Sequence, residues 1–316
     1  MATSSRVTQR QFLLLPSGEI NTCIRYVVAL AAAETGVRIH GICVLSNHYH
    51  IILSDPFGLV PQFQRLVNGL LARAINCYRG RWESLWSAGG NGLSYVQLED
   101  AEAVIDKAVY TATNPVTAGL VSNGEDWPGV RHLQPGSISV NKPGFFFRAL
   151  SGKSQSRKKR TKRDKGAKKP AWREYLEKRR SQDQLPEKAS LQIHPLPIEG
   201  NTAEIQKKLA NRIADAEKRV RIEFRKTGRN FLGVTAIRKQ SPFDSPGSAE
   251  PRRGLSPKVA TRDKWARIAA LQRNKAFEEL HEAARVAFYA GDRDVEFPAG
   301  TYAMRVRYNV NCAPEP

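Results

Sequence analysis

Residues 37–53 read VRIHGICVLSNHYHIIL, and this stretch decides the fold class. Apolar and β-branched residues dominate both of its ends, whereas residues 45–47 in the middle favour a turn. The stretch therefore predicts two neighbouring strands joined as a hairpin. Alternate side chains of a strand point the same way, so His48 and His50 present two imidazoles on one face and Tyr49 points to the other.

Helical patterns lie on both sides of this hairpin. An alanine-rich segment at residues 19–35 is followed by Gly36, the residue type that most often ends a helix. Residues 59–79 carry apolar side chains at helical spacing with basic residues between them, which predicts a second, amphipathic helix. Before both, the apolar run at residues 11–15 favours a short buried strand that ends at a Pro-Ser-Gly turn.

A further strand and helix follow. Residues 93–98 are typical of a strand, and Asp100 stands where it can cap a helix over residues 101–113, which Pro115 should stop. The expected order of strand, helix, two strands, helix, strand and helix favours an α+β fold. It fits a ferredoxin-like, split βαβ arrangement with an antiparallel sheet, which we assign to a domain of residues 1–150.

The distribution of charge separates two parts of the chain. Residues 1–150 hold 12 basic and 10 acidic side chains, and the remaining residues hold 38 and 20, so almost all of the net charge of +20 lies in the second part. Residues 151–169 alone carry ten basic residues and one acidic residue, which predicts a solvated linker or a DNA-gripping arm at 151–170. A polycation of this kind favours nucleic acid as its partner. No apolar run is long enough to predict a membrane span.

The part beyond this arm is expected to be a basic, mostly helical extension over residues 171–316. An apolar stripe over residues 201–227, with an Asn-x-x-Glu start and Gly228 at the end, predicts a long helix. A Pro- and Gly-rich stretch separates it from a second helix at about residues 262–290. No chemical motif lies in this extension.

Neither the cysteines nor the N-terminal sequence indicates a catalytic or metal-binding site. The cysteines contain no CxxC pair, which argues against a zinc ribbon or a thioredoxin-like site, and we expect reduced thiols: Cys23, Cys43, Cys77 and Cys312. The start of the chain lacks a secretory pattern, so the cytoplasm is the expected location.

Two constellations are candidates for chemistry. His48 and His50 on one strand face are half of a metal site, although a lone His-x-His pair is more often structural. Tyr110 and Asn114 stand four residues apart, so they share a helix face, and the Asn side chain supplies a carbonyl oxygen that suits Mg²⁺ or Mn²⁺. Taken alone, this second pair is better explained by packing and a helix end.

A family resemblance joins the two constellations. VLSNHYHIIL resembles the HUH signature of small single-tyrosine transposases, and AVYTATNPVTAGLV followed by DWPGVR resembles the catalytic-helix signature of their REP-associated tyrosine transposase branch. The second pattern matches from the tyrosine through Asn-Pro-Val, Ala-Gly and an apolar pair to a Trp-Pro step: Tyr110, Asn114, Pro115, Val116, Ala118, Gly119, Leu120, Val121, Trp127 and Pro128. The resemblance covers roughly residues 8–135 and leaves the basic C-terminal part unexplained.

The resemblance implies a function. In such an enzyme His48, His50 and Asn114 ligate Mg²⁺ or Mn²⁺, and Tyr110 attacks single-stranded, hairpin-bearing DNA to form a 5′-phosphotyrosine bond. The chain would then be a transposase that cuts and rejoins DNA in the cytoplasm, associated with the nucleoid. Relatives include dimers that exchange the tyrosine helix as well as monomers, so a homodimer is one expectation.

The match has departures, and two other functions stay open. Ser46 replaces the usual Pro, Tyr49 is larger than the usual apolar residue, and no Gly-Arg-aromatic-Lys segment is evident in residues 81–92. One alternative is a domesticated DNA-binding protein that no longer cuts. The other is a zinc-dependent phosphodiester hydrolase that uses water as its nucleophile. The aromatic residues Trp82, Trp86 and Tyr95 are assigned to the core rather than to base stacking.

Overall fold

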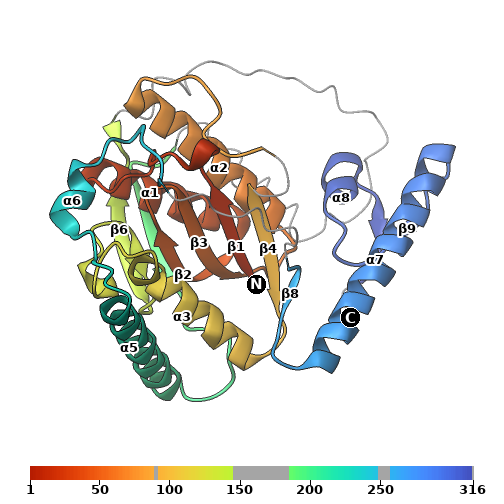
Figure 1. Cartoon of the computed structure of the whole chain (residues 1–316). Coiled ribbons are helices and arrows are strands. Elements are labelled where there is room, and N and C mark those ends of the chain that lie inside the picture. The colour runs from red at the N-terminus through yellow and green to blue at the C-terminus, as the bar shows by residue number, and fades with distance from the viewer. Residues whose placement is uncertain (89–91, 145–184, 248–256, 315–316) are drawn as a thin grey trace.

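The computed structural model describes residues 1–88, 92–144, 185–247 and 257–314 (Figure 1). The basic arm expected at residues 151–170 lies outside them. The strands are β1 (Ala2–Arg6), β2 (Arg38–Val44), β3 (His48–Ser54), β4 (Leu93–Leu98), β5 (Arg131–His132), β6 (Gly136–Asn141), β7 (Lys188–Ile193), β8 (Val259–Ala260), β9 (Glu296–Phe297) and β10 (Asn311–Cys312). The α-helices are α1 (Gly18–Thr35), α2 (Val60–Arg79), α3 (Ala101–Thr117), α5 (Thr202–Lys226), α6 (Val234–Lys239), α7 (Lys264–Ala290) and α8 (Ala303–Tyr308).

One mixed sheet organises the molecule. Its strands follow the order β6-β7-β2-β3-β1-β4-β8, with β5 also paired to β2. The four central strands β2, β3, β1 and β4 are antiparallel neighbours, as expected for the first part of the chain. Strands from the later chain add parallel pairs, since β7 runs parallel to β2 and β8 parallel to β4. The fold is therefore α+β with a mixed, mostly antiparallel sheet.

Helices cover both faces of this sheet. The larger core cluster joins α1 and α2 to Tyr49, Ile51 and Leu53, whereas Ile52 packs on the opposite face against Val104 of α3 and its neighbours. Helix α5 lies against the outside of α3 (Figure 1). Because burial of both strand faces fixes the register of β3, its even-numbered side chains must face α3.

Three helix ends form as the sequence predicts. The side chain of Asp100 accepts a hydrogen bond from the amide of Ala103 at the start of α3, and Asn201 caps α5 through the amide of Ala203. Helix α1 ends at Gly36, whose φ of 72° is the left-handed conformation that glycine adopts without strain.

The first strand does not lie where the sequence pattern predicts it. Residues 11–15 form a turn rather than a strand, although Leu13, Leu14 and Leu15 are buried. Their amides bond outside any sheet ladder, as Leu14 N donates to the carbonyl of Ser46. The strand is instead β1, which lies between β3 and β4 with a polar sequence, ATSSR. Short side chains fit this central position, and they carry no apolar alternation that would reveal it.

Helix α3 also continues past its expected end. It runs to Thr117 with Pro115 inside it. A proline costs a helix one backbone hydrogen bond, and here the loss falls in the last turn, where Pro115 and Val116 are buried. Asn114 therefore lies within regular helix, one turn after Tyr110.

The later chain packs onto these elements. Strand β7 enters the sheet beside β2, and α5 packs on α3. Helices α7 and α8 lie beyond the β4–β8 edge (Figure 1), where Arg305 donates to the carbonyls of Phe57 and Gly58. The described part after residue 184 is built mainly from α5 and α7, in line with the expected helical extension. The division into domains at residues 150 and 170 stays a prediction.

Candidate metal and tyrosine site

Strand β3 presents the two predicted histidines to α3. The ring centroids of His48 and His50 lie 5.1 Å apart. Tyr49 points to the other face, where it is buried, its hydroxyl donates to Asn68, and its ring packs edge-on against Trp86. The predicted alternation and the assignment of Tyr49 to packing are thus confirmed.

Helix α3 brings the other two candidate residues to the same place. The ring of Tyr110 lies 5.3 Å from the ring of His50, centroid to centroid. The amide Nδ2 of Asn114 lies 3.5 Å from Nε2 of His48. The two constellations, about 60 residues apart along the chain, therefore meet in one cluster formed by His48, His50, Tyr110 and Asn114.

Hydrogen bonds define the tautomer of His48. Asn47 Nδ2 donates to the carbonyl of Arg10 at 3.0 Å, so the Asn47 Oδ1 atom faces Nδ1 of His48 at 2.7 Å. An amide oxygen only accepts, and therefore Nδ1 of His48 carries the proton. The lone pair of the neutral ring is then on Nε2, on the side of Asn114. This is the arrangement in which a neighbouring side chain sets the tautomer of a metal-ligating histidine.

His50 is buried without a polar partner. It is 7% exposed, and neither ring nitrogen has a hydrogen-bond partner among the described residues. Burial holds the pKa of His50 well below its ordinary value, and the neighbouring basic groups His48, Lys107 and Arg6 lower it further. The imidazole is therefore neutral near pH 7, which is the form that binds metal.

These residues fit a divalent metal ion. An unpartnered buried imidazole is costly unless something occupies its lone pair, and a metal ion does so. Two ligand atoms that each lie about 2.1 Å from one ion are roughly 3 Å apart. The Asn114 amide lies 3.5 Å from Nε2 of His48, which is close to this distance. Turning the Asn114 amide would place its carbonyl oxygen there. Among described residues no three His, Cys, Asp or Glu side chains gather in a metal-binding group, so an amide completes this set.

Tyr110 is the exposed member of the cluster. Its side chain is 45% exposed, whereas Asn114 and His50 are buried. Lys107, one turn earlier on α3, holds its ammonium Nζ 4.7 Å from the centre of the Tyr110 ring. The nucleophile candidate is thus open to a large substrate, and a cation lies beside it.

Sequence reasoning missed two neighbours of this cluster. Arg6 stands directly opposite His48 in the β1–β3 ladder, so both side chains leave the sheet on one face. Nothing in the polar stretch ATSSR signalled a strand, and Arg6 could not be placed without it. Lys107 was within reach of reasoning, because residues three apart on a helix share a face.

The other aromatic and histidine side chains considered in the sequence are either packed in the structure or exposed to solvent. Trp86 and Tyr95 pack against the α1–α2 core, as assigned, but Trp82 is 90% exposed and was wrongly placed in the core. His40 is satisfied by the carbonyl of Pro195 and the hydroxyl of Ser54.

Comparison with models of protein families, with curated proteins and with solved structures gave no match to this chain. None of the helices in the described ranges combines the length and apolarity needed to cross a membrane.

Proposed function

We propose that the chain is a metal-dependent endonuclease and strand transferase for single-stranded DNA, of the type that it resembles, the REP-associated branch of single-tyrosine HUH transposases. One observation carries the proposal. The two motifs on which the resemblance rests lie far apart in sequence, yet His48, His50, Tyr110 and Asn114 meet in a single cluster. Packing of the core gives no reason for these four residue types to meet. It also gives no reason for a buried imidazole to lack a hydrogen-bond partner among the described residues.

The arrangement of the sheet supports the same proposal. The first six elements, apart from a short 3-10 turn, run β1-α1-β2-β3-α2-β4, and their strands stand in the order β4-β1-β3-β2. We assign this antiparallel unit to the ferredoxin-like, split βαβ group of folds, with β6, β7 and β8 as additions. In this assignment the histidines occupy a central strand and the tyrosine helix follows the last strand of the unit.

His48, His50 and Asn114 are the residues that would hold Mg²⁺ or Mn²⁺. When bound, the ion supplies positive charge to non-bridging phosphate oxygens, where negative charge grows during phosphoryl transfer. The chain itself contributes the neutral imidazoles and the fixed tautomer of His48 described above. It also excludes water from His50 by burying it against α3.

Tyr110 provides the nucleophile. Its phenolic oxygen attacks the phosphorus of a phosphodiester, a new O–P bond forms, and the bond from phosphorus to the 3′ oxygen breaks. The electron pair leaves on the 3′ oxygen, which takes a proton, and the phenolic proton passes to solvent. The 5′-phosphotyrosine bond conserves the energy of the broken bond, so that a later 3′-hydroxyl can reverse the step and join new ends.

The substrate we propose is single-stranded DNA that carries a hairpin, which would place the protein with the nucleoid in the cytoplasm. The net charge of +20 supports a polyanionic partner. The family that the chain resembles includes homodimers, and a homodimer is therefore one form that we propose for this protein.

The decisive experiment is covalent trapping. The protein is incubated with pools of labelled hairpin-bearing single strands in Mn²⁺ or Mg²⁺ and analysed on a denaturing gel, with Tyr110→Phe in parallel. We expect a protein–DNA adduct that is absent with chelator and reduced at least roughly 1000-fold in Tyr110→Phe, because the phenylalanine ring keeps the packing but lacks the nucleophile.

The outcomes separate the alternatives. DNA binding without any adduct would favour a domesticated DNA-binding protein. Cleavage without an adduct, together with zinc retained through purification, would favour a hydrolase that activates water. Tyr49→Phe serves as the matched control, since Tyr49 lies next to the histidines in sequence but on the opposite strand face. It should leave adduct formation intact.

A further inference from the structure

Lys107 shares the inner face of α3 with the proposed nucleophile. Lys107, Tyr110 and Asn114 follow one another at spacings of three and four residues, so their side chains line one face of the helix. The Lys107 ammonium lies 4.7 Å from the centre of the Tyr110 ring. A phosphate that reaches the Tyr110 hydroxyl would therefore come close to this cation.

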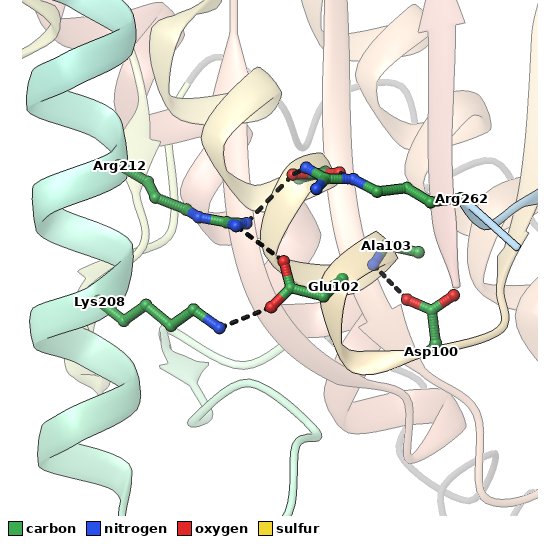
Figure 2. Close-up of polar contacts among 7 residues, drawn as sticks. Asp100, Glu102, Ala103, Lys208, Arg212 and Arg262 are labelled. Carbon is green, nitrogen blue, oxygen red and sulfur yellow. Dashed lines mark hydrogen bonds and ion pairs between the residues drawn. The ribbon is translucent and has the colours of Figure 1, made fainter.

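In the described part of the chain, the acidic residues of α3 pair with cations other than Lys107. Figure 2 shows acidic side chains of α3 turned to other partners, with Lys208 and Arg212 reaching Glu102 at 2.6 and 2.8 Å. Arg262 pairs with Asp106 at 2.6 Å. Within the described ranges the Lys107 side chain forms neither an ion pair nor a hydrogen bond, and its contact with the aromatic ring is the interaction that it makes.

This arrangement is unfavourable unless an anion is bound. Lys107 is half-buried, and burial lowers the pKa of its ammonium. Lys107 shares the surroundings of His50 with His48 and Arg6, since all three basic groups lower the pKa of His50, and none of them is acidic. A cation held among other positive or neutral groups loses hydration without gaining an ion pair, and a phosphate oxygen supplies the missing partner.

We propose that Lys107 binds a non-bridging oxygen of the phosphodiester that Tyr110 attacks. This rests on the proposed function and adds a substrate-binding residue to it. Lys107 would fix the scissile phosphate over the tyrosine hydroxyl and offset the negative charge that grows there during attack. The alternative is that Lys107 only packs on the Tyr110 ring, in which case its charge contributes nothing specific to DNA binding.

Binding measurements in the Tyr110→Phe background separate these two roles, because the ring remains and no DNA is cut. The affinity for a hairpin-bearing single strand is measured against salt concentration for this protein and for added Lys107→Met, Lys107→Arg and Lys208→Met. Lys208→Met is the matched control, since it removes an equal charge from the other side of α3, where Lys208 already pairs with Glu102.

We expect Lys107→Met to weaken binding roughly 10-fold at low salt and to reduce the slope of log affinity against log salt by about 0.7, the value for one lost contact to a single strand. Lys107→Arg should keep most of the affinity. Lys208→Met should leave the slope nearly unchanged. Equal effects of Lys107→Met and Lys208→Met would overturn the proposal.

A scan with single neutral methylphosphonates then identifies the contact. At one phosphate of the strand, the roughly 10-fold difference in affinity between proteins with and without Lys107→Met should vanish, because the charge that Lys107 meets has been removed. A difference that persists at every position would sink the proposal. If the wild-type protein, which keeps Tyr110, forms no adduct with DNA, the proposed cutting function fails. The methylphosphonate scan still decides whether Lys107 binds a phosphate. Absence of any DNA binding would overturn both.

Discussion

The two faces of α3 use charge in opposite ways. On the outer face Glu102 and Asp106 neutralise basic residues of the later chain, including Arg212 at 2.8 Å and Arg262 at 2.6 Å. On the inner face Lys107 and Tyr110 stand beside two histidines, and no carboxylate pairs with Lys107 in the described part of the chain.

This difference shows why net charge alone does not locate a nucleic-acid surface. Some of the excess basic residues after position 150 already form ion pairs with acidic residues of α3 and so attach the later chain to this helix. On the inner face, the ammonium of Lys107 has no opposing carboxylate among the described residues. We therefore expect an anion to be attracted more strongly to the unpaired, half-buried lysine than to the paired arginines.

The strongest challenge to the inner face is His50→Leu. We expect it to abolish the adduct, at least roughly 1000-fold, and at the same time to stabilise the metal-free protein by about 1 kcal/mol, because it removes a buried imidazole with no partner among the described residues. Urea unfolding in chelator measures the stability. Mn²⁺ should stabilise the wild type by about 2.7 kcal/mol at roughly 100 times its dissociation constant and leave the variant unchanged.

Tyr49→Phe on the opposite face of the same strand is the control. It loses the hydrogen bond to Asn68, so it should be less stable in chelator, while Mn²⁺ still stabilises it. A destabilised His50→Leu protein would indicate that His50 is a packing residue and would remove the best support for a metal site.

A smaller effect is expected at Asn47, which holds the tautomer of His48. Asn47→Ala removes both the bond to the Arg10 carbonyl and the acceptor for Nδ1 of His48. Loss of such a partner lowers metal affinity roughly 10- to 100-fold. Mn²⁺ titration followed by electron paramagnetic resonance measures this directly.

Asn21→Ala is a fair comparison for Asn47→Ala, since Asn21 also donates to a backbone carbonyl, that of Pro128. It should cost similar stability and leave Mn²⁺ affinity unchanged. Equal Mn²⁺ affinities in Asn47→Ala and the wild type would mean that His48 needs no support from its neighbour.

The candidate site was largely predictable because its parts lie on regular elements. Period two on β3 separated His48 and His50 from Tyr49, and the helical spacing of Tyr110 and Asn114 put them on one face. Local patterns contain no information on which distant segments meet, so the approach of α3 to β3 came from the resemblance rather than from spacing.

The errors have equally local causes. The three leucines at residues 13–15 are buried, but they lie in a turn. Hydrophobicity alone does not distinguish a buried turn from a buried strand. Strand β1 has the opposite problem, because its short polar side chains fill a central position without apolar alternation. Strand β7 follows a long intervening segment, and its place beside β2 is a long-range pairing that no nearby residue specifies.

The outer face should show the smallest effect. Asp106→Asn leaves the size of the side chain nearly unchanged but removes the charge that meets both Arg262 and Arg212. Because exposed ion pairs contribute little and salt screens them, we expect the melting temperature to fall by no more than roughly 3 °C, with the difference disappearing in about 1 M salt.

The same variant also tests whether the two faces act independently. Asp106 adjoins Lys107 in sequence, but its carboxylate pairs with arginines on the outer side of α3. Adduct formation by Asp106→Asn should therefore stay within about twofold of the wild type at moderate salt, because the side chains of Asp106 and Lys107 share no interaction partner in the described part of the chain. A large loss of adduct formation with an unchanged melting temperature would mean that Arg262 and Arg212, once released from Asp106, disturb the inner face. The ion pairs of the outer face would then be needed to keep the inner face active, and the two faces would not act independently.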